Sequence, residues 1–520
     1  MDVHEELTEL RRRRELLADT ARPEALARRR TSGRRTAREN LDDLLDPESW
    51  VEYGGLAIAA QRGRRSVEEL LVNTPADGLI AGIGRVNEAL VGTDRSACAA
   101  LSYDYLVLAG TQGLTGHRKT DRLFDIVTRL RLPVVFFTEG GGGRPGDTDH
   151  AVVGGLDIMT FALWARLSGV VPRIGIASGR CFAGNALLYG MCDVTIATEG
   201  SSIGMAGPAM IEGGGLGIVD ADAVGPLAVQ VPNGVVDLAV TDDAAAVAVA
   251  RQALSYFQGA LPGWECPDQE LLRELVPAER RAAYDVRRVL DVLADTGSVL
   301  ELRPRFARGM VTALARVEGR PVGVLANNPM HQAGAITSDG ADKAARFLQL
   351  CDAFGLPVVS LCDTPGIMVG PEAERTALVR HAARLFVAAA NLRVPLTTVV
   401  LRKGYGLGAM AMAGGSFHAA SSTVSWPTGE FGGMNLEGAV RLGLRRELAA
   451  IPDETERQAA YEGYVAAAYA HGKALNAATY FEIDDVIDPA ETRRRILATV
   501  RGNPLFRDAT VPDRRVVDTW

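Results

Sequence analysis

Two short glycine-rich turns are the segments of this chain that could do chemistry, and they would act through backbone groups. One turn covers residues 179–185 and the other residues 404–408, and each follows an apolar run and precedes a helix-like stretch. Free N–H groups at such a junction point away from the start of the helix and can hold an anionic oxygen. Two N–H donors aimed at a thioester oxygen would stabilise an enolate. A packing turn, in which glycine only lets a helix approach a strand, explains either turn taken alone.

Side-chain motifs that mark other kinds of catalysis are missing from the sequence. No Ser–His–Asp order stands out, and neither the zinc-protease helix motif nor a phosphate-binding loop with its lysine is present. His117 lies in a polar stretch and could contact a phosphate, although we expect an exposed loop there. Asp363 begins an Asp-Thr-Pro-Gly run after an apolar strand, and we interpret that run as a tight turn at the strand end.

An internal repeat places the two turns at equivalent positions. Residues 171–176 and 394–399 both predict buried strands that begin near a proline, and the turns follow them at matching distances. Strands that alternate with amphipathic helices, such as the helix expected over 343–354, indicate an α/β fold. Coincidence between two generic α/β segments is the alternative. The other matched blocks are 132–137 with 356–361, 182–186 with 405–409, and 201–204 with 424–427.

The repeat divides the chain into two domains of nearly equal size, 1–262 and 263–520. Glycine and proline interrupt the pattern near 259–263, and a helical stretch expected over 277–293 leads to a new strand at 322–326. A chain of 520 residues is too long for one ordinary hydrophobic core, so two domains agree with its length.

Composition and charge exclude several classes of protein. The net charge of −8 argues against a nucleic-acid-binding protein, which would normally carry a basic surface. The six cysteines show neither CxxC pairs nor zinc-ligand spacing, so we expect reduced thiols, no metal site and a cytoplasmic protein. No segment resembles a signal peptide or has the roughly 18 to 20 continuous apolar residues of a membrane span. We therefore expect no nucleic-acid partner and no membrane association.

With the repeat and both turns located, the chain resembles the carboxyltransferase component of biotin-dependent acyl-CoA carboxylases, within the crotonase superfamily. The resemblance covers nearly the whole chain, and residues 207–215 and 233–237 are similar to the branch found in single-chain, long-chain acyl-CoA carboxylases. The propionyl-CoA type has other residues in both turns, but backbone N–H donors survive those exchanges. The motifs that carry the resemblance lie at 36–41, 44–50, 110–113, 140–147, 326–331, 342–347, 402–406, 425–430 and 481–489.

This resemblance implies two tandem crotonase-like domains of the ββα superhelix type, related by duplication. Acyl-CoA would bind mainly to the N-terminal domain and biotin to the C-terminal domain. The resemblance implies that Ala183 and Gly184 hold one oxyanion and that Leu407 and Gly408 hold the other. A carboxyl group would pass from carboxybiotin on a separate carrier protein to the α-carbon of an acyl-CoA, through an enolate. Such chemistry needs no side-chain base, because two preformed oxyanion holes and exclusion of water would carry it.

The resemblance also indicates residues that would bind substrate. They include Gly141, Gly142 and Tyr405, together with Met410, whose apolar side chain hints at an apolar acyl tail. The first forty residues contain eleven arginines, most of which a solvated helix face explains. Arginine can bind a CoA phosphate through two parallel hydrogen bonds. We expect one or two phosphate ligands from the set Arg34, Arg35 and Arg38.

The cofactor and the partners follow from the same resemblance. The four lysines, at 119, 343, 403 and 473, are not flanked by methionines, so the chain shows no biotinylation site of its own. Biotin carboxylase and biotin carboxyl carrier protein would be separate subunits, and the family usually forms a homo-hexamer. Three other functions stay open: a malonyl-CoA or methylmalonyl-CoA decarboxylase with no need of biotin, a catalytically silent scaffold subunit, and a hydratase or isomerase that uses Glu199 and Glu212.

Overall fold

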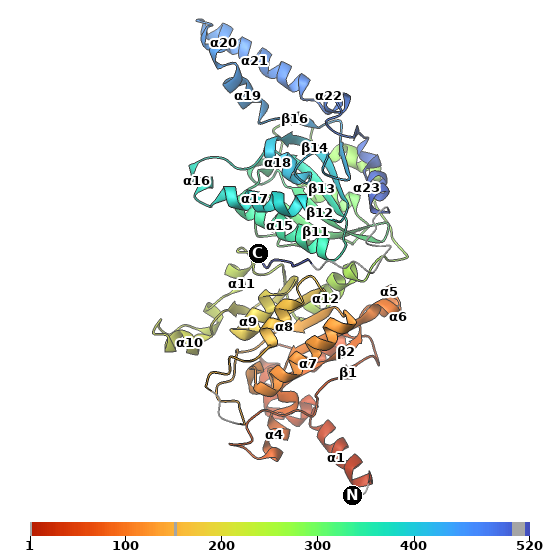
Figure 1. The fold of residues 1–520 in the computed structure, drawn as a ribbon, viewed down its shortest axis with the longest axis vertical. Helices are drawn as coiled ribbons and strands as arrows, with labels where there is room; N and C mark the ends of the chain where they lie inside the picture. Colours follow the sequence, from red (N-terminus) through yellow and green to blue (C-terminus); the bar gives the residue numbers. More distant parts are fainter. Residues whose placement is uncertain (1–2, 150–152, 502–514) are drawn as a thin grey trace. The chain divides into compact units, whose positions relative to one another are not determined.

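The chain forms two compact units, each with its own sheet and its own hydrophobic core (Figure 1). The computed structural model describes residues 3–149, 153–501 and 515–520. The first unit covers Met1–Gly259 and the second covers Ala260–Asp518. Among the described residues, no helix is both long enough and apolar enough to cross a lipid bilayer.

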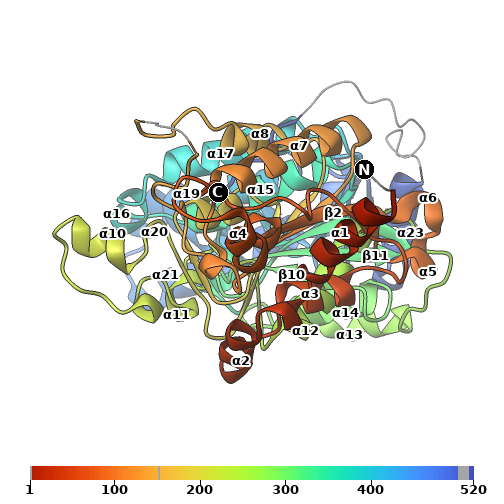
Figure 2. The same ribbon diagram turned by 90° about the horizontal axis from the view of Figure 1, so that it is seen from below.

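The first unit is built on a seven-stranded mixed sheet. Its first three strands are antiparallel and the later ones are parallel. Helices α7 (Leu114–Leu130) and α8 (Thr160–Arg166) pack side by side (Figure 2). Trp164 of α8 is fully buried and stacks on Phe124 of α7, with ring centroids 4.8 Å apart. In spatial order the strands are β1 (Val51–Glu52), β2 (Leu79–Arg85), β3 (Ala97–Tyr103), β4 (Val134–Phe137), β5 (Arg173–Ala177), β7 (Val194–Thr198) and β9 (Leu238–Val240).

The second unit repeats this plan on an eight-stranded sheet. Two antiparallel pairs are again followed by parallel strands. Helices α15 (Ser338–Ala353) and α17 (Leu378–Ala390) cover it as a packed pair. In spatial order the strands are β10 (Leu300–Leu302), β11 (Met310–Val317), β12 (Arg320–Asn327), β13 (Val358–Thr364), β14 (Leu396–Tyr405), β15 (Ser422–Ser425) and β17 (Asp485–Val486), and β16 (Glu430–Gly432) pairs with the end of β14.

A short parallel pairing leads into each glycine-rich turn. In the first unit β6 (Arg180–Phe182) pairs with β8 (Ser202–Gly204), and in the second unit β16 pairs with the last three residues of β14. The two units also share a buried lysine on the long helix, Lys119 on α7 and Lys343 on α15. Each ammonium group donates to two backbone carbonyl oxygens of its own unit. The sequence repeat therefore corresponds to a structural repeat, which extends to single buried side chains.

Most of the expected elements form where the pattern placed them, and the α/β fold is confirmed. The strand expected at 322–326 lies inside β12, and the helix expected at 343–354 lies almost wholly within α15. The helix expected over 277–293 is wrong in its first half, because only α14 (Arg287–Leu293) is helical there. The side chain of Arg402 takes the carbonyl oxygens of residues 279 and 282 as acceptors, at 3.3 and 2.8 Å, in place of helical N–H groups.

Candidate active site

The first glycine-rich turn connects β6 to the short helix α9 (Gly184–Gly190). Ala183 precedes this helix with φ 51° and ψ −121°, a conformation that glycine adopts far more easily than alanine. The Ala183 N–H already donates to the carbonyl oxygen of Gly204, at 3.0 Å. The Gly184 N–H has no acceptor within the described residues. Of the two donors predicted here, Gly184 is therefore the one that the turn leaves available.

The glycine run at 140–143 lies alongside this turn. The Gly142 N–H donates to Asn185 Oδ1 at 3.0 Å, and the Gly142 carbonyl accepts the Gln112 N–H at 2.8 Å. A Cβ on Gly142 would come within 2.7 Å of the Ala183 Cβ, and a Cβ on Gly184 would come within 2.2 Å of Gln112 Oε1. Neither glycine therefore leaves room for a side chain. The predicted residues that the structure brings together here are Gly141, Gly142, Ala183 and Gly184.

The second turn connects β14 to α18 (Gly406–Met412). Gly406 has φ 56° and so takes the place that Ala183 has in the first turn. Leu407 is then the equivalent of Gly184. Neither Leu407 nor Gly408 has an acceptor for its N–H in the part of the chain that the structure describes.

Gly408 lies against the loop that follows β13. A Cβ at this position would be 2.6 Å from the backbone of Gly366 and 3.0 Å from the nitrogen of Ile367, so only glycine fits. Thr364 ends β13 and its hydroxyl accepts the Gly366 N–H at 3.1 Å, which confirms the tight turn expected there. This loop and the run at 140–143 occupy equivalent positions in the two units, because each follows the strand that precedes the turn-bearing one.

A buried carboxylate holds each of these loops at the end of its strand. Glu139 accepts two hydrogen bonds from the Arg29 guanidinium, at 2.8 and 2.7 Å, and burial raises the pKa of Glu139. At the equivalent position, Asp363 lies 2.8 Å from the Lys403 ammonium and accepts the Tyr284 hydroxyl at 2.9 Å. Sequence reasoning missed both carboxylates as site residues. The signal was available, since each stands two residues beyond a matched strand block of the repeat.

Tyr405 and Met410 occupy different environments beside the second turn. Tyr405 is 1% exposed, its hydroxyl donates to Glu430 Oε2 at 3.1 Å, and burial together with the Glu430 carboxylate raises the pKa of Tyr405. Glu430 also accepts the Arg280 Nε–H at 2.6 Å. The Tyr405 hydroxyl is therefore occupied by the protein, whereas Met410 is 36% exposed and lines a pocket.

This pocket, which we call the arm pocket, has a volume of about 660 Å³ and lies wholly in the second unit. It extends from the second turn to the helical arm formed by α19 (Leu436–Gly443) and α21 (Glu454–His471), and to α22 (Ala474–Thr479). Its apolar walls include Met410, Phe417, Phe431, Leu436 and Tyr480, and its ionisable groups are His418, His471, Lys473 and Glu482.

The three candidate arginines differ in how firmly the protein itself holds them. Arg38 is tied to Glu52, with 3.1 Å between Nη1 and Oε2, and Arg35 is tied to Asp43 at 2.6 Å. Within the described part of the chain, the side chain of Arg34 makes one hydrogen bond, to the carbonyl oxygen of Gly200 at 3.1 Å. Arg34 also lies over the start of the first turn, where a Cβ on Gly179 would come within 2.9 Å of its guanidinium.

His117 does not lie in an exposed loop, which corrects that expectation. It is 8% exposed on α7, and its Nδ1 lies 2.9 Å from the Thr160 hydroxyl oxygen. That hydroxyl donates its only proton to Asp121 Oδ1 at 2.6 Å, so His117 Nδ1 must be the donor to Thr160. Glu199 and Glu212, the carboxylates that a hydratase would use, are both exposed.

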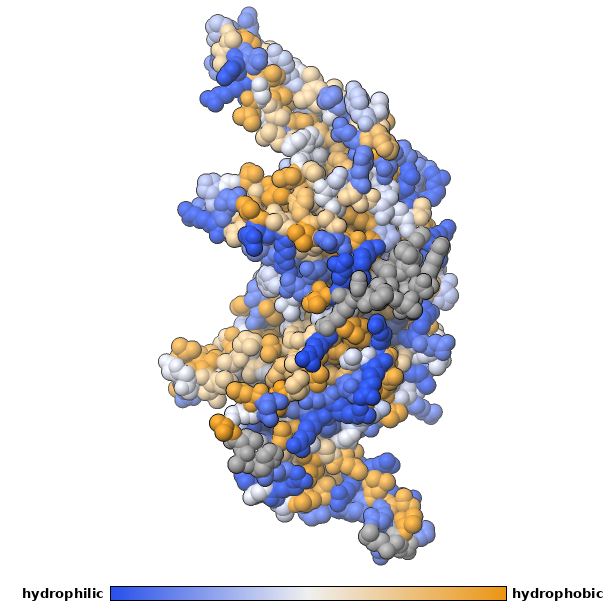
Figure 3. All heavy atoms as spheres, in the orientation of Figure 1, coloured by the Kyte–Doolittle hydropathy of each residue, from blue (hydrophilic) through white to orange (hydrophobic). Residues whose placement is uncertain are grey.

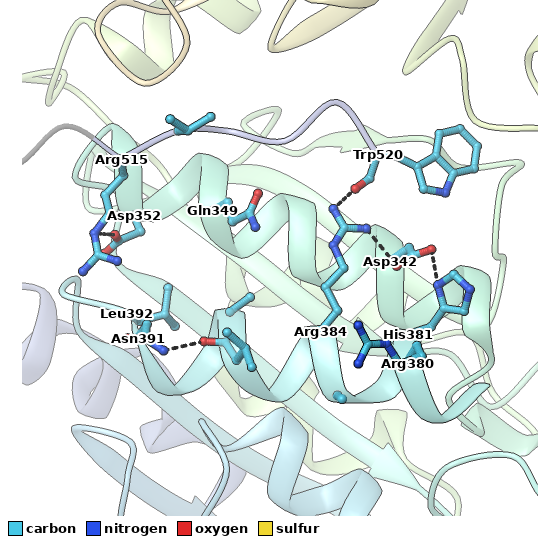
Figure 4. Close-up of a pocket in the computed structure, with 14 residues that line it drawn as sticks. Asp342, Gln349, Asp352, Arg380, His381, Arg384, Asn391, Leu392, Arg515 and Trp520 are labelled. Atoms are coloured by element: carbon cyan, nitrogen blue, oxygen red, sulfur yellow. Dashed lines mark hydrogen bonds and ion pairs between the residues drawn. The ribbon is translucent and has the colours of Figure 1, made fainter. Parts of the chain in front are cut away.

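A second cavity, of about 890 Å³, lies between α15, α17 and the segment 515–520 (Figure 4). Several of its charged side chains pair with one another: Asp342 lies 2.7 Å from His381 Nδ1 and 2.8 Å from Arg384 Nη1. Arg384 also reaches Asp518, at 2.7 Å. None of the predicted site residues lines this cavity. Its polar groups stabilise the packing of the final segment on the helix pair.

Two tandem α/β units of this topology, each with a strand–turn–helix junction that exposes backbone N–H groups, define a crotonase-type carboxyltransferase. The chain belongs to the carboxyl transferase domain family, whose model matches residues 28–502. It is a carboxyltransferase of the biotin-dependent acyl-CoA carboxylase class.

Three matches to known proteins and structures illustrate this membership. The methylmalonyl-CoA carboxyltransferase 12S subunit of Propionibacterium freudenreichii subsp. shermanii is 33% identical over 483 residues, which cover 90% of this chain and 88% of that protein. The structure of a single-chain, multi-domain long-chain acyl-CoA carboxylase matches with a TM-score of 0.90 at 58% identity. That match covers 95% of this chain, and this chain spans 48% of that enzyme. The transcarboxylase 12S hexamer, with methylmalonyl-CoA and methylmalonic acid bound, matches with a TM-score of 0.85 at 29% identity over 100% of this chain and 98% of that one.

Proposed function

We propose that this chain transfers a carboxyl group between biotin and the α-carbon of an acyl-CoA, through an enolate stabilised by backbone N–H groups. The observation that carries the proposal is the pair of equivalent donors, Gly184 in the first unit and Leu407 in the second, whose N–H groups have no acceptor in the described part of the chain. Ala183 and Gly408 complete the two predicted pairs. In this structure the Ala183 N–H is held by Gly204, so Gly184 acts as the main donor of the first turn.

Backbone donors at fixed positions suit an oxyanion because they need no reorganisation when charge develops. The buried carboxylates Glu139 and Asp363 fix the loop beside each turn, and the close contacts of Gly142 and Gly408 fix the spacing. Each donor contributes about 3 kcal/mol to stabilising the transition state, by analogy with other oxyanion holes. No side-chain base is then needed at either turn.

The residues around the second turn fit biotin. The arm pocket is large and mostly apolar, and the absence of a Cβ at Gly408 leaves the first turn of α18 close to the Gly366 loop. Biotin, when bound, supplies the carboxyl group that is transferred. Leu407 and Gly408 would hold its ureido oxygen through their N–H groups.

Acyl-CoA would bind to the first unit. Arg34 is the arginine that the protein holds least firmly among the three candidates, and we propose that it binds a CoA phosphate. We assign Arg35 and Arg38 a structural role, because each is paired with a carboxylate of the protein. The 58% identity to a long-chain acyl-CoA carboxylase, together with the apolar Met410, supports an acyl group longer than acetyl.

The partners that we propose are a biotin carboxylase, a separate biotin carboxyl carrier protein and further copies of this chain in a hexamer. The similar transcarboxylase 12S protein assembles as a hexamer. Apolar side chains stand exposed on the projecting segment around α10 (Pro208–Gly213) (Figure 3). No residue of the 18-residue helix α21 is buried. Such surfaces suit an interface with another subunit. The exposed apolar residues around α10 are Met205, Met210, Leu216 and Ile218.

The test removes one N–H without removing a side-chain function. Proline is tolerated in the first turn of a helix, so Leu407→Pro deletes the proposed donor, whereas Leu407→Ala keeps it. Leu407 is 60% exposed, so neither change creates a cavity. We expect Leu407→Pro to lower biocytin-dependent loss of the carboxyl group from malonyl-CoA or methylmalonyl-CoA by about 100-fold.

Leu407→Ala should keep most of this activity, and circular dichroism should show both variants folded. Equal rates for the two variants would exclude Leu407 as a donor. Turnover of the acyl-CoA by the unaltered chain without biocytin would instead indicate a decarboxylase. Absence of turnover with either substrate would leave a longer acyl-CoA substrate, a missing partner or a silent subunit.

A further inference from the structure

Lysine is rare in this chain, and three of the four lysines are committed to structure. The chain has four lysines among 56 basic side chains. Lys119 and Lys343 are buried, and each donates to two backbone carbonyl oxygens. The ammonium of Lys403 lies 2.8 Å from the buried carboxylate of Asp363. These three groups have partners that replace the water they lost on burial.

Lys473 is the exception. It is exposed between α21 and α22, and its side chain has no hydrogen-bond or ion-pair partner among the described residues. Its backbone is nevertheless fixed, because it forms a bridge with Glu430, the residue that holds the Tyr405 hydroxyl. Lys473 is therefore a free ammonium group on an anchored backbone.

Lys473 lines the arm pocket, in which Met410 and Phe431 form apolar walls. Two other groups that can carry positive charge, His418 and His471, line the same pocket, and Glu482 is its one carboxylate. A compact ammonium with three donors is a point charge that suits a carboxylate, whereas arginine, which this chain uses nearly everywhere else, suits a planar two-point contact. The pocket thus combines apolar walls with an ammonium group and two imidazoles.

We propose that Lys473 binds the carboxylate of the group being transferred and so distinguishes carboxylated ligands from uncarboxylated ones. This inference rests on the proposed function, because that function brings a carboxylate to the second turn. Two ligands could present it: an acyl-CoA that carries the carboxyl group on its α-carbon, or biotin that carries it on its ring. Lys473 is a ligand-contacting residue in this proposal and takes no proton.

The test uses the scarcity of lysine. Acylation of the folded chain with sulfosuccinimidyl acetate should modify Lys473, while Lys119, Lys343 and Lys403 should react only after unfolding, as peptide mass spectrometry would show. The labelling is then repeated with malonyl-CoA, with biotin methyl ester, with both together, and with acetyl-CoA as the ligand that has no carboxylate. The methyl ester removes the carboxylate of the biotin side chain.

We expect a carboxylated ligand to slow labelling of Lys473 about tenfold, the effect of one hydrogen bond between charged groups. Slowing by malonyl-CoA alone assigns the contact to the acyl-CoA carboxylate, and slowing only by both ligands together assigns it to carboxylated biotin. Equal slowing by acetyl-CoA or by biotin methyl ester alone would overturn the proposal. The slower labelling would then mean only that a bound ligand covers Lys473. Turnover with no slowing in any arm would overturn the Lys473 contact and leave carboxyl transfer intact. Slowing by malonyl-CoA without turnover would support the contact and count against transfer.

Substitution gives a second readout. Lys473→Met should raise the KM for malonyl-CoA about tenfold with a smaller change in kcat, and Lys473→Arg should recover part of the loss. Arg494→Met, which removes one exposed positive charge outside the pocket, is the matched control. Equal KM values for the two variants would exclude a contact with the acyl-CoA carboxylate, and equal KM and kcat values would overturn the proposal.

Discussion

Ala183 carries a strain that its neighbours impose. Its φ of 51° and ψ of −121° are unfavourable for any residue with a Cβ, and its Cβ faces Gly142. Ala183→Gly should therefore raise the free energy of unfolding by about 1 kcal/mol, the relief of strain less the added entropy of glycine in the unfolded chain. Urea unfolding measures this change, and the N–H of residue 183 is unaffected.

Ala186 is the control for this substitution. It lies in the same helix, α9, with helical geometry and 6% exposure, so Ala186→Gly should lower the free energy of unfolding by about 1 kcal/mol. A destabilising effect of similar size at both positions would show that the backbone at 183 is not strained.

The N–H donors of the two turns show how much of the candidate site could be predicted from the sequence at the scale of single residues. A small-residue turn between a strand and a helix predicts free N–H groups, and the structure has them at Gly184 and Leu407. The sequence could not show that the Ala183 N–H is taken by Gly204, because that bond depends on the pairing of β6 with β8. Nor could it show which N–H groups correspond, since that follows from the positive φ of Ala183 and Gly406.

At the scale of elements, the pairing of α7 with α8 makes the first unit sensitive to acid. His117 is buried in this contact, and its burial lowers its pKa from 6.5 to about 4. Between these two values the unfolded chain binds a proton that the folded chain does not. The contribution of His117 to stability is therefore complete above about pH 6.5 and is lost as the pH falls towards 4, by about 3 kcal/mol in all.

Comparison with His117→Asn isolates this effect. Asparagine can replace the donor that Nδ1 offers to Thr160 and has no proton to gain in this range. Between about pH 4 and pH 6.5, the free energy of unfolding measured in urea should depend more steeply on pH in the unaltered chain than in the variant. Parallel pH profiles would mean that His117 accepts a proton in the folded state.

Elements with strong local patterns were predictable, and those decided by distant side chains were not. The strand at 322–326 and the helix at 343–354 follow from continuous apolar runs and helical spacing. The stretch at 277–286 has helix-forming residues, but Arg402 uses its carbonyl groups and Tyr284 bonds to Asp363. His117 was misjudged for the same reason, because a polar stretch gives no sign that α8 will cover it.

At the scale of the molecule, duplication has produced two units, each with its own hydrophobic core. The reactivity of the cysteines in each unit reports on that unit separately. Burial raises the pKa of Cys98 and of Cys181 to about 12 and raises the pKa of Cys192, Cys351 and Cys362 as well, so their thiols are protected both by burial and by protonation. The sixth, Cys266, is partly exposed. We expect a thiol reagent to titrate one cysteine in the folded chain and six in denaturant, with Cys266→Ser removing the first.

The same thiols test whether each unit unfolds as one body. Three buried cysteines belong to the first unit and two to the second. In pulse labelling at increasing urea, Cys98, Cys181 and Cys192 should become reactive together, because β3 and β5 belong to one sheet and α9 contacts both β5 and β6. Cys351 and Cys362, on α15 and β13, should likewise react together. Different midpoints within either set would show that the unit is not a single cooperative structure, whereas a difference between the sets would give the separate stability of the two duplicated halves.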